Sequence, residues 1–63
     1  MKSELKIVIE GASGSMKTVI AHEIAILLKK KFKKSAEIFD AKPSKRSAAS
    51  LADVVIHTIN TGT

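Results

Sequence analysis

Residues 11–18, which read Gly-Ala-Ser-Gly-Ser-Met-Lys-Thr, place the groups that can hold a phosphate within one short stretch. Gly11 and Gly14 permit a tight turn in which several backbone N–H groups converge on one point. Lys17 would set an ammonium group beside the outer phosphates, and the hydroxyl of Thr18 is a suitable ligand for a bridging magnesium ion. The pattern therefore predicts a phosphate-binding loop.

The segments on either side of this loop are expected to position it. Residues 6–10 contain the apolar run Ile-Val-Ile, ended by Gly11, which is typical of a strand in a parallel sheet covered on both faces. From residue 16 to residue 32, apolar side chains recur at helical spacing without glycine or proline, which predicts a long helix. The positive end of that helix's dipole would face a phosphate held by the loop.

The second half of the chain predicts three more elements. Residues 36–40 form a short second strand, which is closed by a turn with lysines and a proline at residues 42–47. Residues 47–52 predict a turn or two of helix. Residues 54–59 are so rich in β-branched side chains that they predict a third strand, and a helix that continues through Ile59 is the alternative.

This order of elements predicts one α/β domain over residues 1–63, with a three-stranded parallel sheet, one long helix and one short helix. Either the second or the third strand can pair with the first, so the strand order is left open. Two helices of such unequal length leave one face of the sheet partly bare. We therefore expect a homo-oligomer that buries the bare face.

Parallel strands all end at one edge of a sheet, so the position of each remaining charged residue relative to its strand predicts whether it lies at the loop edge or at the far edge. Asp40 ends the second strand at the loop edge, so it is the acid that we consider for magnesium, with an ordinary turn aspartate as the alternative. Arg46, with Lys42 and Lys45, follows the same strand and would either add to the phosphate site or belong to a solvated turn. Asp53 begins the third strand and is expected at the far edge.

In this setting residues 11–18 resemble the Walker A motif of the P-loop NTPases, G-x-x-x-x-G-K-[ST], with matches at Gly11, Lys17 and Thr18. Met16 stands where the family has its second glycine, and its side chain would crowd a backbone meant to lie close to a phosphate. The resemblance implies a minimal P-loop fold that binds ATP or GTP with magnesium at Thr18, and the position of Asp40 at the loop edge adds a second candidate ligand for the magnesium. The residues expected at the nucleotide are those of the loop, Gly11, Ala12, Ser13, Gly14, Ser15, Met16, Lys17 and Thr18, and the position after the second strand adds Arg46.

The family's other machinery is not found. Its members usually carry a second strand motif, Walker B, ending in an acid that orders the magnesium ion, often beside a residue that activates the attacking water. No Walker B motif is identified, Asp40 is the one acid considered for magnesium, and no residue is identified that would activate water, so no catalytic residue is assigned and little or no turnover is expected.

The charged residues of the chain indicate which kinds of molecule it could bind. Eleven basic and six acidic residues give a net charge of +5, which favours an anionic partner. Five of the lysines lie in residues 29–34, roughly 25 Å from the loop at 1.5 Å per helical residue, so they cannot touch the same phosphate. They form either a solvated helix end or a contact for an acidic protein, a nucleic acid or a membrane surface. The chain has no cysteine and therefore no disulfide, which says little about its compartment. Because we find no leader-like or membrane-spanning segment, we expect a cytoplasmic protein.

Three functions are compatible with these features. The leading one is a small nucleotide-binding P-loop protein, and its size resembles orphan P-loop proteins of phage and mobile genomes. The second is a protein-interaction or inhibitor module that keeps the fold without the ligand. The third is binding to nucleic-acid backbone through lysines, although two phenylalanines and no tyrosine or tryptophan leave little for base stacking.

Overall fold

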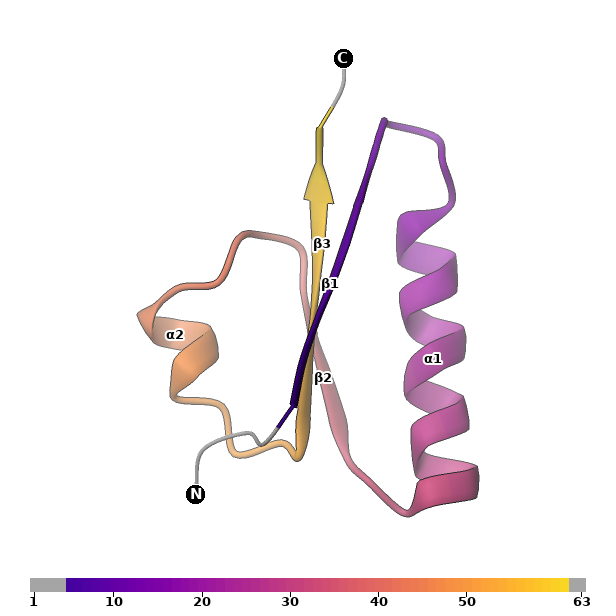
Figure 1. The fold of residues 1–63 in the computed structure, drawn as a ribbon, viewed down its shortest axis with the longest axis vertical. Helices are drawn as coiled ribbons and strands as arrows, with labels where there is room; N and C mark the ends of the chain where they lie inside the picture. Colours follow the sequence, from indigo (N-terminus) through magenta and orange to yellow (C-terminus); the bar gives the residue numbers. More distant parts are fainter. Residues whose placement is uncertain (1–4, 62–63) are drawn as a thin grey trace.

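The computed structural model describes residues 5–61, which form an α/β fold (Figure 1). Its elements are, in chain order, β1 (Leu5–Gly11), α1 (Lys17–Phe32), β2 (Ala36–Phe39), α2 (Lys45–Ala48) and β3 (Val54–Asn60). Both strand pairs are parallel, so the predicted sheet with one long and one short helix is confirmed. The alternative of a helix through Ile59 is wrong, because that segment is β3.

The third strand lies in the middle of the sheet, in the order β1-β3-β2. The connection from β1 to β2, which contains α1, therefore passes over β3, and the connection from β2 to β3, which contains α2, runs back in the opposite direction. Because crossover connections between parallel strands are right-handed, the two helices lie on opposite faces of the sheet. Figure 1 shows α1 on one side of the sheet and α2 on the other. In the register of the two neighbouring strands, Gly11 at the end of β1 lies opposite Asn60 at the end of β3.

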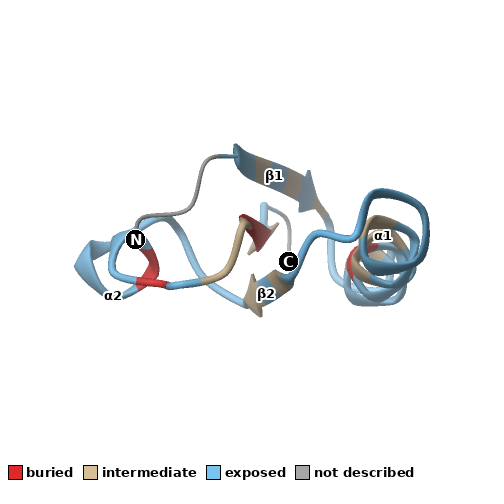
Figure 2. Cartoon of the chain, turned by 90° about the horizontal axis from the view of Figure 1, so that it is seen from below, coloured by how far each residue is buried: buried red, intermediate tan, exposed pale blue. Residues whose placement is uncertain are grey.

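Burial concentrates on the central strand. Residues 54–58 are all buried, and Figure 2 shows β3 as the buried strand between β1 and β2. Val54 and Ile56 pack with the fully buried Ala21 of α1, whose small side chain lets the helix lie close to the sheet. A strand with a neighbour at each edge and a helix on each side has no solvated face, which explains why most of its residues are β-branched.

Two buried polar side chains of β3 fasten the end of β2. His57 Nδ1 lies 3.0 Å from the backbone oxygen of Ala41, so this nitrogen carries the proton and donates it. The His57 ring also stacks on Phe39, with ring centroids 5.8 Å apart. The Thr58 hydroxyl donates to Asp40 Oδ1 over 2.7 Å. The carboxyl end of β2 is thereby held against the central strand.

The short helix begins earlier than the sequence predicts. The expected segment, residues 47–52, is wrong in its bounds, because α2 spans Lys45–Ala48. Ser44 is the N-cap, where its side chain accepts a hydrogen bond from the Ser47 N–H and the Ser47 hydroxyl accepts one from the Ser44 N–H. This capping box has serine where glutamate or glutamine is usual, which removes the ordinary sequence signal for the helix start.

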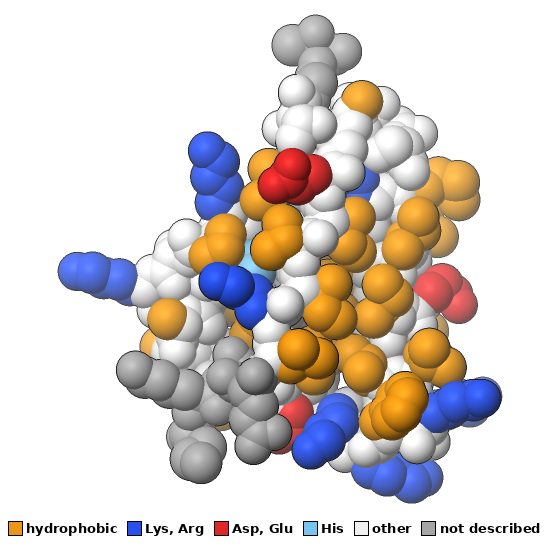
Figure 3. Space-filling model, viewed as in Figure 1, with side chains coloured by type: hydrophobic (Ala, Val, Ile, Leu, Met, Phe, Trp, Pro, Cys, Tyr) orange, Lys and Arg blue, Asp and Glu red, His pale blue; other side chains and the backbone are white. Residues whose placement is uncertain are grey.

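Large apolar side chains remain at the surface of α1 and β1. Figure 3 shows them spread over the face on which β1 lies nearest to the viewer and over the adjoining side of α1. In the part of the chain that the structure describes, the exposed large apolar residues are Leu5, Val8, Met16, Val19, Ile20, Ile26, Leu27, Phe32 and Leu51. Within residues 5–61, no helix is long and apolar enough to cross a membrane.

Candidate functional site

The loop that joins β1 to α1 is a tight turn followed by a left-handed residue. The Ser15 N–H donates to the Ala12 carbonyl over 3.1 Å, and Gly14, the third residue of this turn, has φ +82°. A positive φ at that position is the mark of a type II turn and is the reason for glycine there. The turn is also compact, because a Cβ added to Gly11 would lie 2.7 Å from the Ser15 hydroxyl oxygen.

Met16 precedes the helix in the left-handed region, with φ 67° and ψ 24°. A side chain is strained in this conformation and glycine is not, so the backbone here has the shape that suits the glycine of the P-loop family. The Met16 side chain is 61% exposed and borders a hollow along α1 that Ile20 and Leu27 also line. Met16 therefore has a left-handed backbone conformation that glycine adopts more easily.

The amino end of α1 has no cap of its own. The first helical hydrogen bond runs from the Ile20 N–H to the Met16 carbonyl over 2.9 Å, which leaves the N–H groups of Lys17, Thr18 and Val19 without helical partners. No side chain caps this end, and no acid lies in the first turn of the helix. Unpaired N–H groups at the positive end of a helix dipole favour an anion.

The Lys17 side chain bends back over the loop. Its Nζ donates to the Ala12 carbonyl and to Asn60 Oδ1, each over 3.2 Å. Both partners are neutral oxygens, so the hydrogen bonds of the ammonium group leave its charge uncompensated. Asn60 reaches Lys17 because β3 pairs directly with β1. The positive charge and the uncapped helix end therefore lie at one place, the carboxyl edge of the sheet.

The sequence predicts that Asn60 lies near the loop edge and could contact a ligand, but it does not predict the contact with Lys17. Its position at the end of the third strand puts it at the loop edge, but only the strand order β1-β3-β2 makes it a neighbour of the loop. With β2 beside β1 instead, Asp40 would have occupied this place. The sequence contains no signal that decides between the two orders.

The two predicted magnesium ligands lie at the ends of different elements. Thr18 is exposed in the first turn of α1, and Asp40 follows β2, where it accepts the hydrogen bond from Thr58. Among residues 5–61 no three acidic or histidine side chains gather closely enough to hold a metal ion. A magnesium ion at Thr18 would therefore need phosphate oxygens and water as its other ligands, and the part of Asp40 stays a prediction.

Arg46 belongs to α2, on the side of the sheet opposite α1, and its side chain is exposed (Figure 1). Its predicted contact with a bound phosphate stays a prediction. The structure thus brings together the loop, Lys17 and the end of β3, whereas the backbone of Arg46 lies on the opposite face of the sheet.

The opposite edge of the sheet has a different chemistry. Asp53 lies there as expected: its Oδ2 accepts from the Ser35 N–H over 3.0 Å and from the Ser35 hydroxyl over 3.3 Å. The Ser35 backbone N–H, helped by the Ser35 hydroxyl and by the charge of Lys34, lowers the pKa of Asp53 below its ordinary value despite an opposing effect of desolvation.

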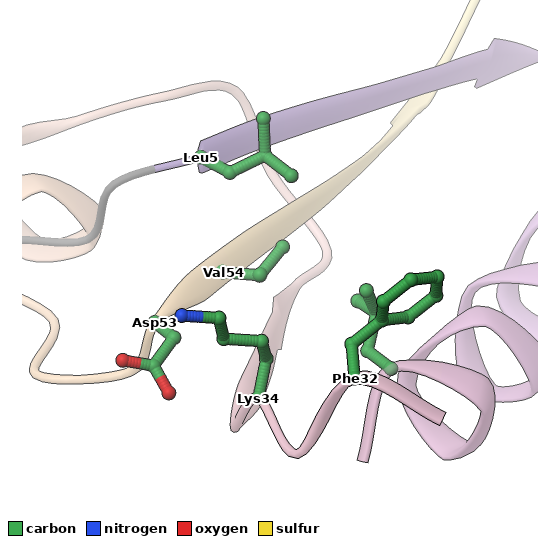
Figure 4. A pocket seen from close by; sticks show the side chains of 6 residues that line it. Leu5, Phe32, Lys34, Asp53 and Val54 are labelled. Atoms are coloured by element: carbon green, nitrogen blue, oxygen red, sulfur yellow. The ribbon is translucent and has the colours of Figure 1, made fainter. Parts of the chain in front are cut away.

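A largely apolar hollow of about 440 Å³ opens at this same far edge (Figure 4). Leu5, Phe32 and Val54 line it with Leu28, and Lys34 and Asp53 lie at its rim. Because these residues sit at the amino ends of β1 and β3 and at the end of α1, the hollow is separate from the phosphate loop.

No protein-family model matches the chain, and comparison with curated proteins and with solved structures likewise finds no match. The resemblance to the P-loop NTPases thus stays a prediction that rests on residues 11–18 and their setting.

Proposed function

We propose that this protein binds the phosphates of a nucleotide, ATP or GTP with magnesium, at residues 11–18. The observation that carries the proposal is the coincidence at one point of the uncompensated Lys17 ammonium and the uncapped N-terminus of α1. A phosphate would accept hydrogen bonds from the free N–H groups and neutralise the lysine at the same time.

The resting contacts of Lys17 support this proposal. Both of its hydrogen bonds measure 3.2 Å, the long end of the usual range, and both go to neutral acceptors. A charge-assisted bond to phosphate is roughly twice as strong as a neutral one, so the exchange of partners favours the bound state. In this account Ala12 and Asn60 hold the ammonium group in place until a phosphate replaces them.

The same site argues for binding with little or no turnover. The strand beside the loop ends in the neutral Asn60, where family members are expected to carry an acid for magnesium. Asp40 is already held by Thr58. A bound nucleotide would thus meet the loop amides, Lys17 and Thr18, and we identify no residue in the described part of the chain that is placed to activate water. A cytoplasmic location, where magnesium nucleotides are abundant, fits this proposal.

Titration calorimetry with ATP, GTP and pyrophosphate, each with and without magnesium, tests the proposal. We expect saturable binding by the unmodified chain and none by Lys17→Ala. Lys29→Ala is the matched control, because it removes an equal charge from the other end of the same helix and should bind normally. Binding that Lys17→Ala retains and Lys29→Ala loses would refute the proposal.

The second candidate, an interaction module without a ligand, is supported by the apolar side chains left at the surface of α1 and β1. It predicts that the calorimetry gives no heat of binding for any of the three anions. The two functions are therefore separated by the same experiment.

A further inference from the structure

The outer edge of β1 has no neighbouring strand within residues 5–61. β3 pairs with β1 on one side only, and β2 lies on the far side of β3. The edge is seven residues long, whereas the other open edge, that of β2, has four. An unpaired edge of this length presents a row of N–H and C=O groups that can pair with another strand.

The direction of each backbone group follows from the hydrogen bonds at the two ends of β1. The Leu5 N–H donates to the Asp53 carbonyl over 3.4 Å, and the Gly11 carbonyl accepts from the Thr61 N–H over 2.9 Å. Successive residues of a strand point their backbone groups to alternate sides, so the odd-numbered residues address β3. The N–H and C=O groups of Lys6, Val8 and Glu10 therefore point to the open edge.

This pattern selects one register for a second copy of the chain. In an antiparallel pair, two opposite residues exchange both of their backbone hydrogen bonds. A two-fold axis at Val8 makes the two Val8 residues such a pair, and Lys6 of each copy then lies opposite Glu10 of the other. The side chains of Lys6, Val8 and Glu10 are all exposed and share one face of the strand. The register thus joins opposite charges twice around an apolar centre.

Apolar surface beside the edge favours the same partner. Leu5 and Phe32 border one hollow next to β1, and Met16, Ile20 and Leu27 border another along α1. These five side chains are between 46% and 61% exposed. Apolar side chains that stay exposed beside an open sheet edge are typical of an interaction site. Figure 3 shows hydrophobic side chains covering this side of the molecule.

We propose that two copies of this chain pair through the outer edge of β1, antiparallel about Val8, to form a continuous six-stranded sheet with two Lys6–Glu10 contacts across the axis. Each copy would extend the other's sheet and add the apolar row of Ile7 and Ile9 next to the exposed side of α1. The interface is isologous, so it closes at two copies.

Charge exchange tests this pairing. Sedimentation equilibrium at high micromolar concentration and low salt should give twice the chain mass of 6.8 kDa for the unmodified chain. Lys6→Glu and Glu10→Lys each place like charges opposite one another twice, and each should raise the dimer dissociation constant roughly tenfold or more. An equal mixture of the two variants should recover the dimer, because every cross-axis pair is then again attractive.

A second pair of variants tests the position of the axis. Val8→Lys sets two ammonium groups side by side at the axis and should abolish the dimer. Ile26→Lys adds the same charge at an exposed apolar residue of α1 that borders neither hollow, and it should leave the dimer intact. A monomeric unmodified chain, single charge variants that dimerise as well as it does, a mixture that stays monomeric, or equal effects of Val8→Lys and Ile26→Lys would each overturn the proposal.

Discussion

Replacing Met16 with glycine should make the protein both more stable and a better phosphate binder. Met16 is held at φ 67°, where an L-residue pays about 1–2 kcal/mol and glycine does not. The greater conformational entropy of glycine in the unfolded chain offsets part of the relieved strain, so we expect a net rise of about 1 kcal/mol in the free energy of unfolding. For a domain of this size that corresponds to a melting temperature roughly 4–8 °C higher.

Lys33→Gly is the matched control for this variant. Lys33 ends the same helix at φ 57°, so glycine relieves the same strain there without touching the loop. Urea unfolding should show similar gains for both variants. Pyrophosphate titration should show about tenfold tighter binding, equivalent to roughly 1.4 kcal/mol, for Met16→Gly alone. If Lys33→Gly is stabilised and Met16→Gly is not, or if the two bind pyrophosphate equally, the reasoning about Met16 is refuted.

Three further substitutions test the contacts around the sheet. Asn60→Asp sets a carboxylate beside the Lys17 ammonium. Thermal denaturation without ligand should therefore show a free energy of unfolding that is higher by up to about 1 kcal/mol at low salt, and ATP binding should become more dependent on magnesium. No change in either measurement would contradict the contact. Asp53→Asn keeps the acceptor for Ser35 but loses the charge. Because the pKa of Asp53 is lowered in the folded state, its stabilising effect is present above its ordinary pKa and is lost as pH falls through the folded value. The variant should thus be the less stable protein at neutral pH in urea unfolding, with a difference that vanishes in acid; a pH-independent difference would speak against this assignment. Thr58→Val removes a buried donor to a carboxylate and should cost about 1.5 kcal/mol by the same method, whereas an unchanged stability would show that the bond contributes nothing.

Much of the fold could be predicted because its elements have strong local signals. The β-branched run of β3 and the helical spacing of α1 identify both elements, and the alternation of strand and helix implies parallel pairing. The start of α2 has no comparable signal, because its cap pairs Ser44 with Ser47, and serine is common in turns as well as in caps.

The site was predicted only where it is local in sequence. The turn and Lys17 lie in one motif, so the types and spacing of their residues suffice. The contact between Lys17 and Asn60 spans 43 residues and depends on β3 lying next to β1. Two orders of a three-stranded sheet satisfy the same hydrophobic pattern, so the identity of the residue beside the loop follows from tertiary packing alone.

The central claim is that the loop and the uncapped end of α1 hold phosphate, and backbone amide chemical shifts test it most directly. A ¹⁵N-labelled sample titrated with pyrophosphate and magnesium should show saturable shifts that centre on the amides of Gly14, Lys17 and Thr18, with smaller shifts at Asn60 as its lysine partner departs. Shifts confined to the lysine-rich end of α1, or no saturable shift in the loop, would contradict the claim.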